Sequence, residues 1–299
     1  MPSSSVPLVV IAAAGQSKRF ASQQKVLAEV GGRPAICRVA DTCAQALGPH
    51  EQVIVIGHQG AQVRAVLGEA PYRSYVIQEP QLGTGHALSA ALANLEPVPD
   101  REVFLLCGDR PLLTADSLRR LRQERQASGA AMVFLVGKLR GDALESRQGR
   151  VVQAHRGTPR AEVLAIVERP TVDALDGRRL AFESLTGERY EFSREQLLAV
   201  REVNLSAYVW PESVLRANLG KLAVHPEKGE YFVTDLVEVL RQQRLLVRLV
   251  AASADGERIG IDTPEQLRAA QQEWRRWQES PPVRAPASGI AEEASDALL

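Results

Sequence analysis

The alternation of short apolar runs with helix-like segments in the first half of the chain constrains the fold more than any other feature. The first run, 6–14, is apolar and is closed by Gly15, which is typical of a strand buried on both faces. Further runs follow at 53–57, 75–77, 103–107 and 132–137, and helical patterns separate them at 35–47, 61–67, 84–95 and 114–128. This alternation predicts an α/β fold, with a Rossmann-like, mostly parallel sheet and helices on both of its faces.

The second half of the chain has a different pattern. After Lys138 the segments are charged and punctuated by glycine. Short strands are expected at 150–154, 162–168, 203–210 and 245–251, and a helix at 233–243. The polar stretch 171–195 has too few apolar residues for a core of its own, so it predicts a small inserted lobe or a cover over the main sheet. The tail, 281–299, is rich in Pro, Ala, Ser and Glu without periodicity, and we expect it to be disordered.

The charge balance limits the range of partners. The 299 residues include 36 basic and 36 acidic side chains, so no overall field attracts nucleic acid or an anionic membrane. The three cysteines form no C-x-x-C pair, which favours reduced thiols. The longest apolar run near the N-terminus is far shorter than the roughly 18 residues of a membrane span. We therefore expect a cytoplasmic protein that binds small molecules, and neither nucleic acid nor a membrane.

A small-residue turn with two cations follows the first predicted strand. Ala13, Ala14 and Gly15 let backbone N–H groups approach an anion closely, and Arg19 and Lys25 add positive charge for a polyphosphate. The turn matches neither the Walker A pattern nor G-x-G-x-x-G, which argues against kinase-like NTPases and dinucleotide dehydrogenases. A tight turn with solvated cations is the alternative explanation.

Two aspartates at predicted strand ends are candidates for a metal site. Asp109 follows the buried run 103–107, at the edge where open α/β sheets bind ligands, and Gly108 before it leaves room for a substrate. Mg²⁺ prefers one or two carboxylates together with phosphate oxygens. Because a single aspartate rarely fixes this ion, we expect Asp262, at the end of the short apolar segment 259–261, to be the second ligand. Each aspartate could instead cap the helix that follows it.

A glycine-flanked threonine marks a second turn. Thr84 stands between Gly83 and Gly85 where a helix is expected to begin, so a backbone bend, a hydroxyl cap and free N–H groups converge there. The amide of Gln78 both donates and accepts hydrogen bonds, as the edge of a pyrimidine base requires. A purely structural turn is the alternative.

These segments resemble the motifs of the sugar-phosphate nucleotidyltransferases. The string from Ala13 to Arg19 with 25–27 is similar to L-A-A-G-x-G-x-R-M followed by P-K-x-L, 108–113 to G-D-x-P-L-L, and 260–263 to G-[VI]-[ND]-[TD]. Ser17 replaces the second glycine, Gln24 replaces the proline before the lysine, and the gap between arginine and lysine is one residue shorter. The G-Q-S-x-R form is also similar to the loop of molybdenum-cofactor nucleotidyltransferases, and the loop alone does not choose between the two.

The order of the remaining motifs resembles the uridylyltransferase domain of the bacterial N-acetylglucosamine-1-phosphate uridylyltransferases. Residues 78–87, Q-E-P-Q-L-G-T-G-H-A, are similar to the uracil-binding turn of that family. Four more segments, 148–151, 166–168, 202–208 and 228–235, are similar to its sugar-binding motifs. Two departures lie in these motifs: Gln148 replaces a tyrosine, and 205–207 replace T-G-I. A third lies in the earlier segment 108–113, where Arg110 occupies a position that is more often apolar.

The resemblance implies a set of roles for these residues. Arg19, Lys25 and Asp109 would be catalytic, and Asp109 and Asp262 would bind Mg²⁺. The NTP would be bound by Ala13, Ala14, Gly15, Gln78, Gly83, Thr84 and Gly108, and the sugar by Gly149, Glu168, Asn204 and Thr234. The resemblance also implies one nucleotidyltransferase domain over 1–275, with a nucleotide-binding half at about 8–137 and a sugar-phosphate-binding half at about 138–272.

The implied activity is transfer of a uridylyl group from UTP to N-acetylglucosamine 1-phosphate. The acetyltransferase β-helix of the bifunctional members, and the activity it carries, are expected to be absent. Two alternatives stay open. One is cytidylyl or guanylyl transfer to another sugar phosphate or to a molybdenum-type cofactor, and the other is a nucleotide-sugar-binding protein without turnover.

Overall fold

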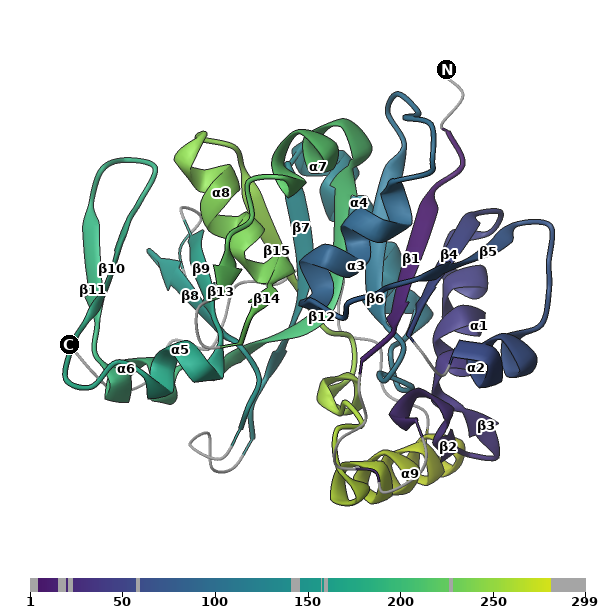
Figure 1. Cartoon of the computed structure of the whole chain (residues 1–299). Coiled ribbons are helices and arrows are strands. Elements are labelled where there is room, and N and C mark those ends of the chain that lie inside the picture. The colour runs from purple at the N-terminus through teal and green to yellow at the C-terminus, as the bar shows by residue number, and fades with distance from the viewer. Residues whose placement is uncertain are drawn as a thin grey trace.

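The computed structural model describes residues 5–15, 20, 24–57, 60–140, 146–156, 158, 161–225 and 228–280. A nine-stranded sheet forms its centre, and the main path of that sheet runs β15-β7-β12-β6-β1-β4-β5 (Figure 1). These strands are β1 (Leu8–Ala13), β4 (Glu51–Ile56), β5 (Arg73–Ile77), β6 (Glu102–Cys107), β7 (Met132–Lys138), β12 (Glu202–Pro211) and β15 (Val247–Ala251). β12 is antiparallel to both of its neighbours, and the other pairs on this path are parallel. The predicted α/β fold with a mostly parallel sheet is confirmed.

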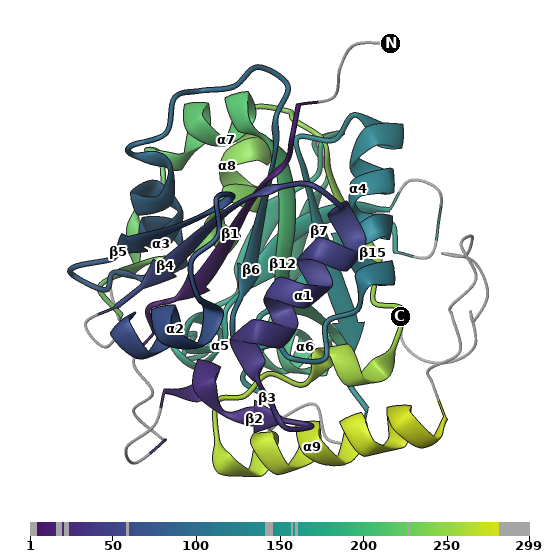
Figure 2. The same cartoon turned by 90° about the vertical axis from the view of Figure 1, so that its right-hand side faces the viewer.

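Helices cover both faces of the sheet (Figures 1 and 2). They are α1 (Ala35–Leu47), α2 (Gly60–Leu67), α3 (Gly83–Leu92), α4 (Ala115–Ser128), α7 (Glu212–Leu219) and α8 (Leu236–Gln242). The C-terminal helix, α9 (Pro264–Glu279), lies below the sheet in Figure 1 and packs against Val30 and Leu112. In β1, Val9 and Ile11 belong to the apolar cluster that includes residues of α1, α2 and α4, whereas Leu8 and Val10 belong to the cluster with α3, α7 and α8. Because alternate side chains of a strand point to opposite faces, two covered faces require the continuous apolar runs seen in the sequence.

Helix boundaries follow the predictions closely, with one exception. α1 coincides with the predicted 35–47, and α4 begins after Thr114, whose hydroxyl accepts a hydrogen bond from Ser117 N at 3.2 Å. The predicted helix 233–243 instead divides into a 3-10 turn, Val233–Asp235, and α8. Two short hairpins, β2–β3 (Glu29–Val30 and Arg33–Pro34) and β13–β14 (Val224–His225 and Glu230–Tyr231), were not predicted, since two residues carry no periodicity.

A small lobe extends from the end of the sheet, beyond β8 (Arg150–Ala154) and β9 (Glu162–Val167), as Figure 1 shows on its left side. It contains α5 (Arg169–Asp173), the hairpin β10–β11 (Leu180–Glu183 and Arg189–Phe192) and α6 (Arg194–Ala199). An apolar cluster joins β8 and β9 to Val172, Leu197 and Leu198. The expectation that this stretch has no core of its own agrees with this cluster, because the apolar residues of the lobe pack on the two strands before it. It lies beside the main sheet and does not cover it.

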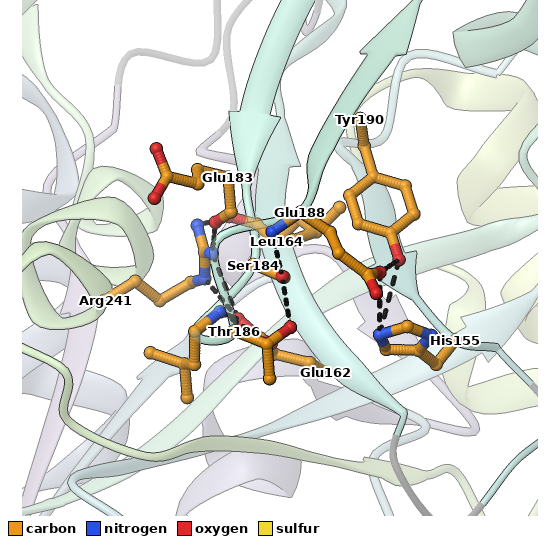
Figure 3. A network of polar contacts seen from close by, with 10 residues as sticks. His155, Glu162, Leu164, Glu183, Ser184, Thr186, Glu188, Tyr190 and Arg241 are labelled. Atoms are coloured by element: carbon orange, nitrogen blue, oxygen red, sulfur yellow. Dashed lines mark hydrogen bonds and ion pairs between the residues drawn. The ribbon is translucent and has the colours of Figure 1, made fainter.

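A buried arginine ties this lobe to the main sheet (Figure 3). Arg241 of α8 is 9% exposed, and it donates hydrogen bonds to Glu162 Oε1 at 3.0 and 3.2 Å and to the Leu164 carbonyl at 3.0 Å. It also donates to the carbonyl of Glu183, while Glu162 accepts from the backbone N–H of Leu185 at 3.0 Å. Removing one member of a buried ion pair typically costs about 3–5 kcal/mol, so this contact fixes the lobe firmly against α8.

Within the described residues, no helix has the length and apolar character needed to cross a lipid bilayer. All three cysteines lie in this part of the chain, and none of them forms a disulfide. The predicted tail, 281–299, lies outside the described residues.

Candidate active site

The first cavity of the site lies at the carboxyl end of β1 and has a volume of about 550 Å³. Eight of the predicted nucleotide-site residues line it: Ala13, Ala14, Gly15, Lys25, Gln78, Gly83, Thr84 and Asp109. Gly57, which follows β4, packs so closely against the turn at 13–15 that no side chain fits there: a Cβ would lie 2.8 Å from the Ala14 carbonyl oxygen. Arg19, the other predicted cation, lies outside the described residues.

Lys25 bridges the two predicted metal ligands. Its Nζ lies 2.5 Å from Asp109 Oδ2 and 2.7 Å from Asp262 Oδ1. Asp109 follows β6 and Asp262 precedes α9, and the backbone N–H of Ile261 donates to the Asp109 carbonyl at 2.9 Å, which locks the two loops together. Residues 153 positions apart in the sequence therefore present carboxylates to one point.

Neither aspartate is a helix cap, which removes the structural alternative for both. The N-cap of α4 is Thr114, and the N-cap of α9 is Thr263, which forms a capping box with Gln266. Gln266 also accepts a hydrogen bond from the Asp262 backbone N–H at 2.7 Å, so this loop is held while its carboxylate points to Lys25.

The charges at this point explain the protonation of Lys25. Burial lowers the pKa of Lys25, but the negative charges of Asp109 and Asp262 outweigh it, so the pKa is held above its usual value. Two carboxylates converging on one cation are the hard-oxygen donor set that Mg²⁺ prefers when phosphate oxygens complete its shell. The residues therefore fit a divalent ion. No cluster of three or more His, Cys, Asp or Glu side chains suited to a metal occurs in the described ranges.

The second turn is built around Gln78, which is 4% exposed at the end of β5. Its Nε2 donates to the Gly83 carbonyl at 2.9 Å and lies 3.2 Å from His86 Nδ1. Gly83 has a φ of +87°, and a Cβ there would lie 2.7 Å from the Tyr231 carbonyl oxygen, so only glycine fits without strain. The side chain of Gln78 thus fixes the shape of the turn from inside.

Thr84 does not have the capping role predicted from the sequence. The N-cap of α3 is Leu82, and no side chain caps it, whereas Thr84 lies within the first turn of the helix. Its hydroxyl accepts a hydrogen bond from the backbone N–H of Val233 at 3.1 Å. Thr84 therefore joins the turn to the segment after β14. Gly108 also differs from its predicted role of leaving room for the substrate, because it lines neither this cavity nor the second one described below. A Cβ there would lie 3.4 Å from the Ala12 carbonyl oxygen and from the side chain of Ile36.

The second cavity, of about 700 Å³, lies next to the first. Gly149, Glu168, Asn204 and Asp262 are among the residues that line it. Burial raises the pKa of Glu168 to about 7. A Cβ on Gly149 would lie 3.0 Å from Glu168 Oε1, so the missing side chain makes room for the carboxyl group. Thr234 is 4% exposed and does not line this cavity.

A bulge in β12 presents Asn204 to this cavity. The pairing of β12 with β7 shifts between Asn204 and Tyr208, and Ser206 between them has a φ of +55°. Asn204 Nδ2 donates to Tyr208 Oη at 2.5 Å, and Asn204 Oδ1 accepts from Ser206 N at 3.0 Å. Bulges that redirect a side chain are common beside active sites. The family motif has glycine at position 206, where this left-handed backbone occurs.

Several residues of the site were not assigned from the sequence. Lys228, Glu230 and Phe232 line the first cavity, and Arg110, Gln148 and Arg258 line the second. Arg110 and Gln148 could have been singled out from the sequence, because both depart from the family motifs. Arg258 lies in no recognised motif.

Comparison with known proteins now identifies the family. Residues 9–181 match the model of the MobA-like NTP transferase domain, which is more than half of the chain. The chain belongs to this family. The transferase is 33% identical over 263 residues to the bifunctional protein GlmU of Heliobacterium modesticaldum, covering 88% of this chain and 50% of that protein. It is 35% identical over 260 residues to GlmU of Chromobacterium violaceum, covering 87% and 50%. The transferase spans about half the length of these curated relatives.

Solved structures confirm the fold of the transferase. A UDP-glucose pyrophosphorylase complexed with UDP-glucose superposes with a TM-score of 0.67 at 14% identity, over 91% of this chain and 99% of that one. A CMP:2-keto-3-deoxy-manno-octonic acid synthetase complexed with CTP superposes with a TM-score of 0.61 at 18% identity, with the same coverage. The predicted relationship to sugar-phosphate nucleotidyltransferases is thereby confirmed at the level of family and fold.

Proposed function

We propose that the transferase moves a uridylyl group from UTP to a sugar 1-phosphate, with N-acetylglucosamine 1-phosphate as the first acceptor to test, and releases pyrophosphate. The observation that carries this proposal is the bridge of Asp109, Lys25 and Asp262. Asp109 lines the first cavity and Asp262 the second, so the bridge lies where a nucleotide and an acceptor would meet. The resemblance of residues 78–87 and of the later motifs to those of the N-acetylglucosamine-1-phosphate uridylyltransferases is our reason for testing UTP and N-acetylglucosamine 1-phosphate first.

The chemistry needs alignment and charge neutralisation. An oxygen of the acceptor phosphate forms a bond to the α-phosphorus of the NTP, the bond from that phosphorus to the bridging oxygen breaks, and pyrophosphate leaves. Because the attacking oxygen is already anionic, no protein base has to remove a proton. Asp109 and Asp262 would hold Mg²⁺, which supplies neutralisation of phosphate charge when bound.

The remaining residues orient the two substrates. Lys25 keeps its proton and places positive charge beside the phosphates, and Arg19 is proposed to act with it. The backbone of 13–15 faces the polyphosphate, and Gln78, Gly83 and Thr84 form the turn proposed to read the base. Glu168 and Asn204 would accept and donate hydrogen bonds to sugar hydroxyls. Positioning of this kind accounts for most of the rate enhancement in phosphoryl transfer.

A pyrophosphate-release assay tests the proposal. The four NTPs are crossed with N-acetylglucosamine 1-phosphate, glucose 1-phosphate and mannose 1-phosphate, with Mg²⁺ and with EDTA. We expect release that requires Mg²⁺ and is fastest with UTP. Tight nucleotide binding without any release would instead favour a nucleotide-sugar-binding protein.

A second candidate keeps the chemistry and changes both substrates. The matching family model is MobA-like, and the G-Q-S-x-R loop is similar to that of the molybdenum-cofactor nucleotidyltransferases, so this candidate is cytidylyl or guanylyl transfer to another sugar phosphate or to a molybdenum-type cofactor. A preference for CTP or GTP in the same assay would favour this candidate. We place either activity in the cytoplasm, where its small-molecule substrates occur.

A further inference from the structure

The second cavity carries more positive charge than a neutral sugar requires. Four arginines line it, Arg110, Arg140, Arg147 and Arg258, and of these Arg140 is ion-paired with Asp255. Among the described residues that line it, the acidic groups are Glu168 and Asp262, and Asp262 is directed to Lys25. The 1-phosphate of the acceptor has to lie beside Lys25 and the two aspartates, where the new bond forms, whereas the hydroxyl and acetamido groups of the sugar ring need hydrogen-bond partners but no cationic wall.

Arg110 is the most buried of these arginines. It follows Asp109 directly and is 9% exposed. Its Nη1 donates to the carbonyl of Arg258 at 3.3 Å, and its guanidinium packs on Gly260, where a Cβ would lie 3.6 Å from Cζ. A guanidinium has five N–H donors, and within the described residues this carbonyl is the one acceptor that Arg110 meets. A buried charge is costly unless it is paired, so the remaining donors call for an anion.

Arg258 presents a second set of donors to the same cavity. Gln148 Nε2 donates to its carbonyl at 3.1 Å, which together with Arg110 fixes the backbone of the segment. The Nε of Arg258 is buried and has no hydrogen-bond partner within the described part of the chain. The carbonyl of Arg258 is thus held by the Arg110 guanidinium and the Gln148 amide, and both arginines line the second cavity, on the same side as Asp262.

The neighbouring carboxyl group offers little compensation. Glu168 faces Arg110, Thr234 and Asp235, and burial raises its pKa to about 7, so it is only partly charged at neutral pH. The cationic wall is therefore available to a ligand.

We propose that Arg110, with Arg258, binds a second acidic group of the acceptor, so that the preferred acceptors are sugar 1-phosphates bearing a ring carboxylate or a second phosphate. This inference rests on the proposed nucleotidyl transfer and narrows its acceptor. Bidentate pairing of a guanidinium with a carboxylate or phosphate is stronger and more specific than a neutral hydrogen bond.

The test compares acceptors that share one ring. Glucose 1-phosphate, glucuronic acid 1-phosphate and glucose 1,6-bisphosphate differ at C6 alone, and the last two separate carboxylate from phosphate recognition. With UTP and Mg²⁺, we expect kcat/KM for at least one acidic acceptor to exceed that for glucose 1-phosphate by tenfold or more. Arg110→Met should lower this preference about 10- to 100-fold, the range of one charge-assisted pair. Arg110→Lys should retain part of it.

Arg119→Met is the matched control, because it removes the same charge from the side of α4 and should leave the acceptor preference unchanged. Isothermal titration of each acceptor into the protein provides a readout that does not depend on turnover, and thermal unfolding checks that the variants are folded. Equal kcat/KM and equal affinity for neutral and acidic acceptors would overturn the inference and leave the proposed function intact. If no NTP gives pyrophosphate with any acceptor, the proposed function fails, and calorimetry decides the inference: tighter binding of the acidic acceptors that is lost in Arg110→Met upholds it, and equal binding overturns it.

Discussion

The two cavities of this transferase are built on different principles. The first lies at the carboxyl ends of the parallel strands β1 and β6 and is formed largely by backbone and small residues such as Ala13, Ala14 and Gly15. The second lies against the antiparallel strands β8, β9 and β12 and is lined by long polar side chains, among them Arg110 and Glu168. Backbone geometry depends on the fold, whereas side-chain identity can change without it. The first cavity should therefore tolerate little change, and the second should accept substitutions that alter the acceptor.

The largest expected effect lies where the two cavities meet. Asp109→Asn keeps the size of the side chain but removes one of the two carboxylates around Lys25. We expect pyrophosphate release to fall by about 10²- to 10³-fold, the usual loss for an electrostatic group at the reacting centre. Circular dichroism and the thermal midpoint should stay close to those of the parent.

Asp116→Asn is the control for this change, since it removes a partly exposed aspartate from the first turn of α4. Its turnover should match that of the parent. Full activity of Asp109→Asn would rule out a metal ion held by Asp109 and Asp262. It would also rule out the proposal that the substrates in the two cavities meet at this point.

The next effect tests the backbone character of the first cavity. Gly83→Ala places a Cβ 2.7 Å from the Tyr231 carbonyl oxygen at a φ of +87°. We expect the free energy of unfolding to fall by about 2 kcal/mol or more and KM for the NTP to rise about tenfold, because the turn must shift.

Gly68→Ala is the control that separates backbone strain from displacement of the turn. Gly68 also has a positive φ of +68°, but the space around it is open, so a Cβ there displaces nothing. In this variant the free energy of unfolding should fall by about 1 kcal/mol, and KM for the NTP should stay unchanged. Denaturant unfolding and steady-state kinetics measure both quantities. A Gly83→Ala variant with unaltered KM would show that this turn does not contact the nucleotide.

The same contrast explains which parts could be predicted from sequence. The strands of the first half, the turn at 13–15 and both aspartates could be predicted, because buried strands and the residues at their carboxyl ends follow from local pattern. The meeting of Asp109 and Asp262 was expected as well, but the position of Lys25 between them was not, because tertiary contacts decide which side chain lies between two loops. The bulge at Ser206 and the hairpin β10–β11 were missed as well. Their side chains are half-buried or locally strained, and neither condition leaves a periodic signal.

A pH effect is expected from the second cavity. The pKa of Glu168 is raised from 4.5 to about 7, so the folded protein holds a proton that the unfolded chain has lost between these values. Its contribution to stability is fully present below pH 4.5 and is lost as pH rises through 7. As pH rises through 7, Glu168 becomes a carboxylate, and this form is proposed to accept hydrogen bonds from the sugar. We therefore expect KM for glucose 1-phosphate, which has no acidic group at C6, to fall about 3- to 10-fold between pH 6 and pH 8.

Glu168→Gln cannot ionise, so both trends should flatten in this variant: unfolding free energy against pH, and acceptor KM against pH. KM for the NTP serves as the internal control, because Glu168 does not line the first cavity. If the variant keeps the pH dependence of the parent, another group is responsible and Glu168 does not bind the sugar.

The smallest expected effect concerns the bulge itself. Ser206 has a φ of +55°, a conformation that costs a residue with a Cβ about 1–2 kcal/mol. Ser206→Gly removes that strain, but it also gives the unfolded chain more freedom, which offsets about 0.4–1 kcal/mol. The net result should be a stabilisation of between zero and about 1.6 kcal/mol, measured as a higher denaturant midpoint with an unchanged slope. Ser128→Gly, at the last residue of α4, should act in the opposite direction because its backbone is helical. A loss of stability in Ser206→Gly would mean that the serine side chain holds the bulge. The acceptor side would then depend on side chains even for the path of its backbone.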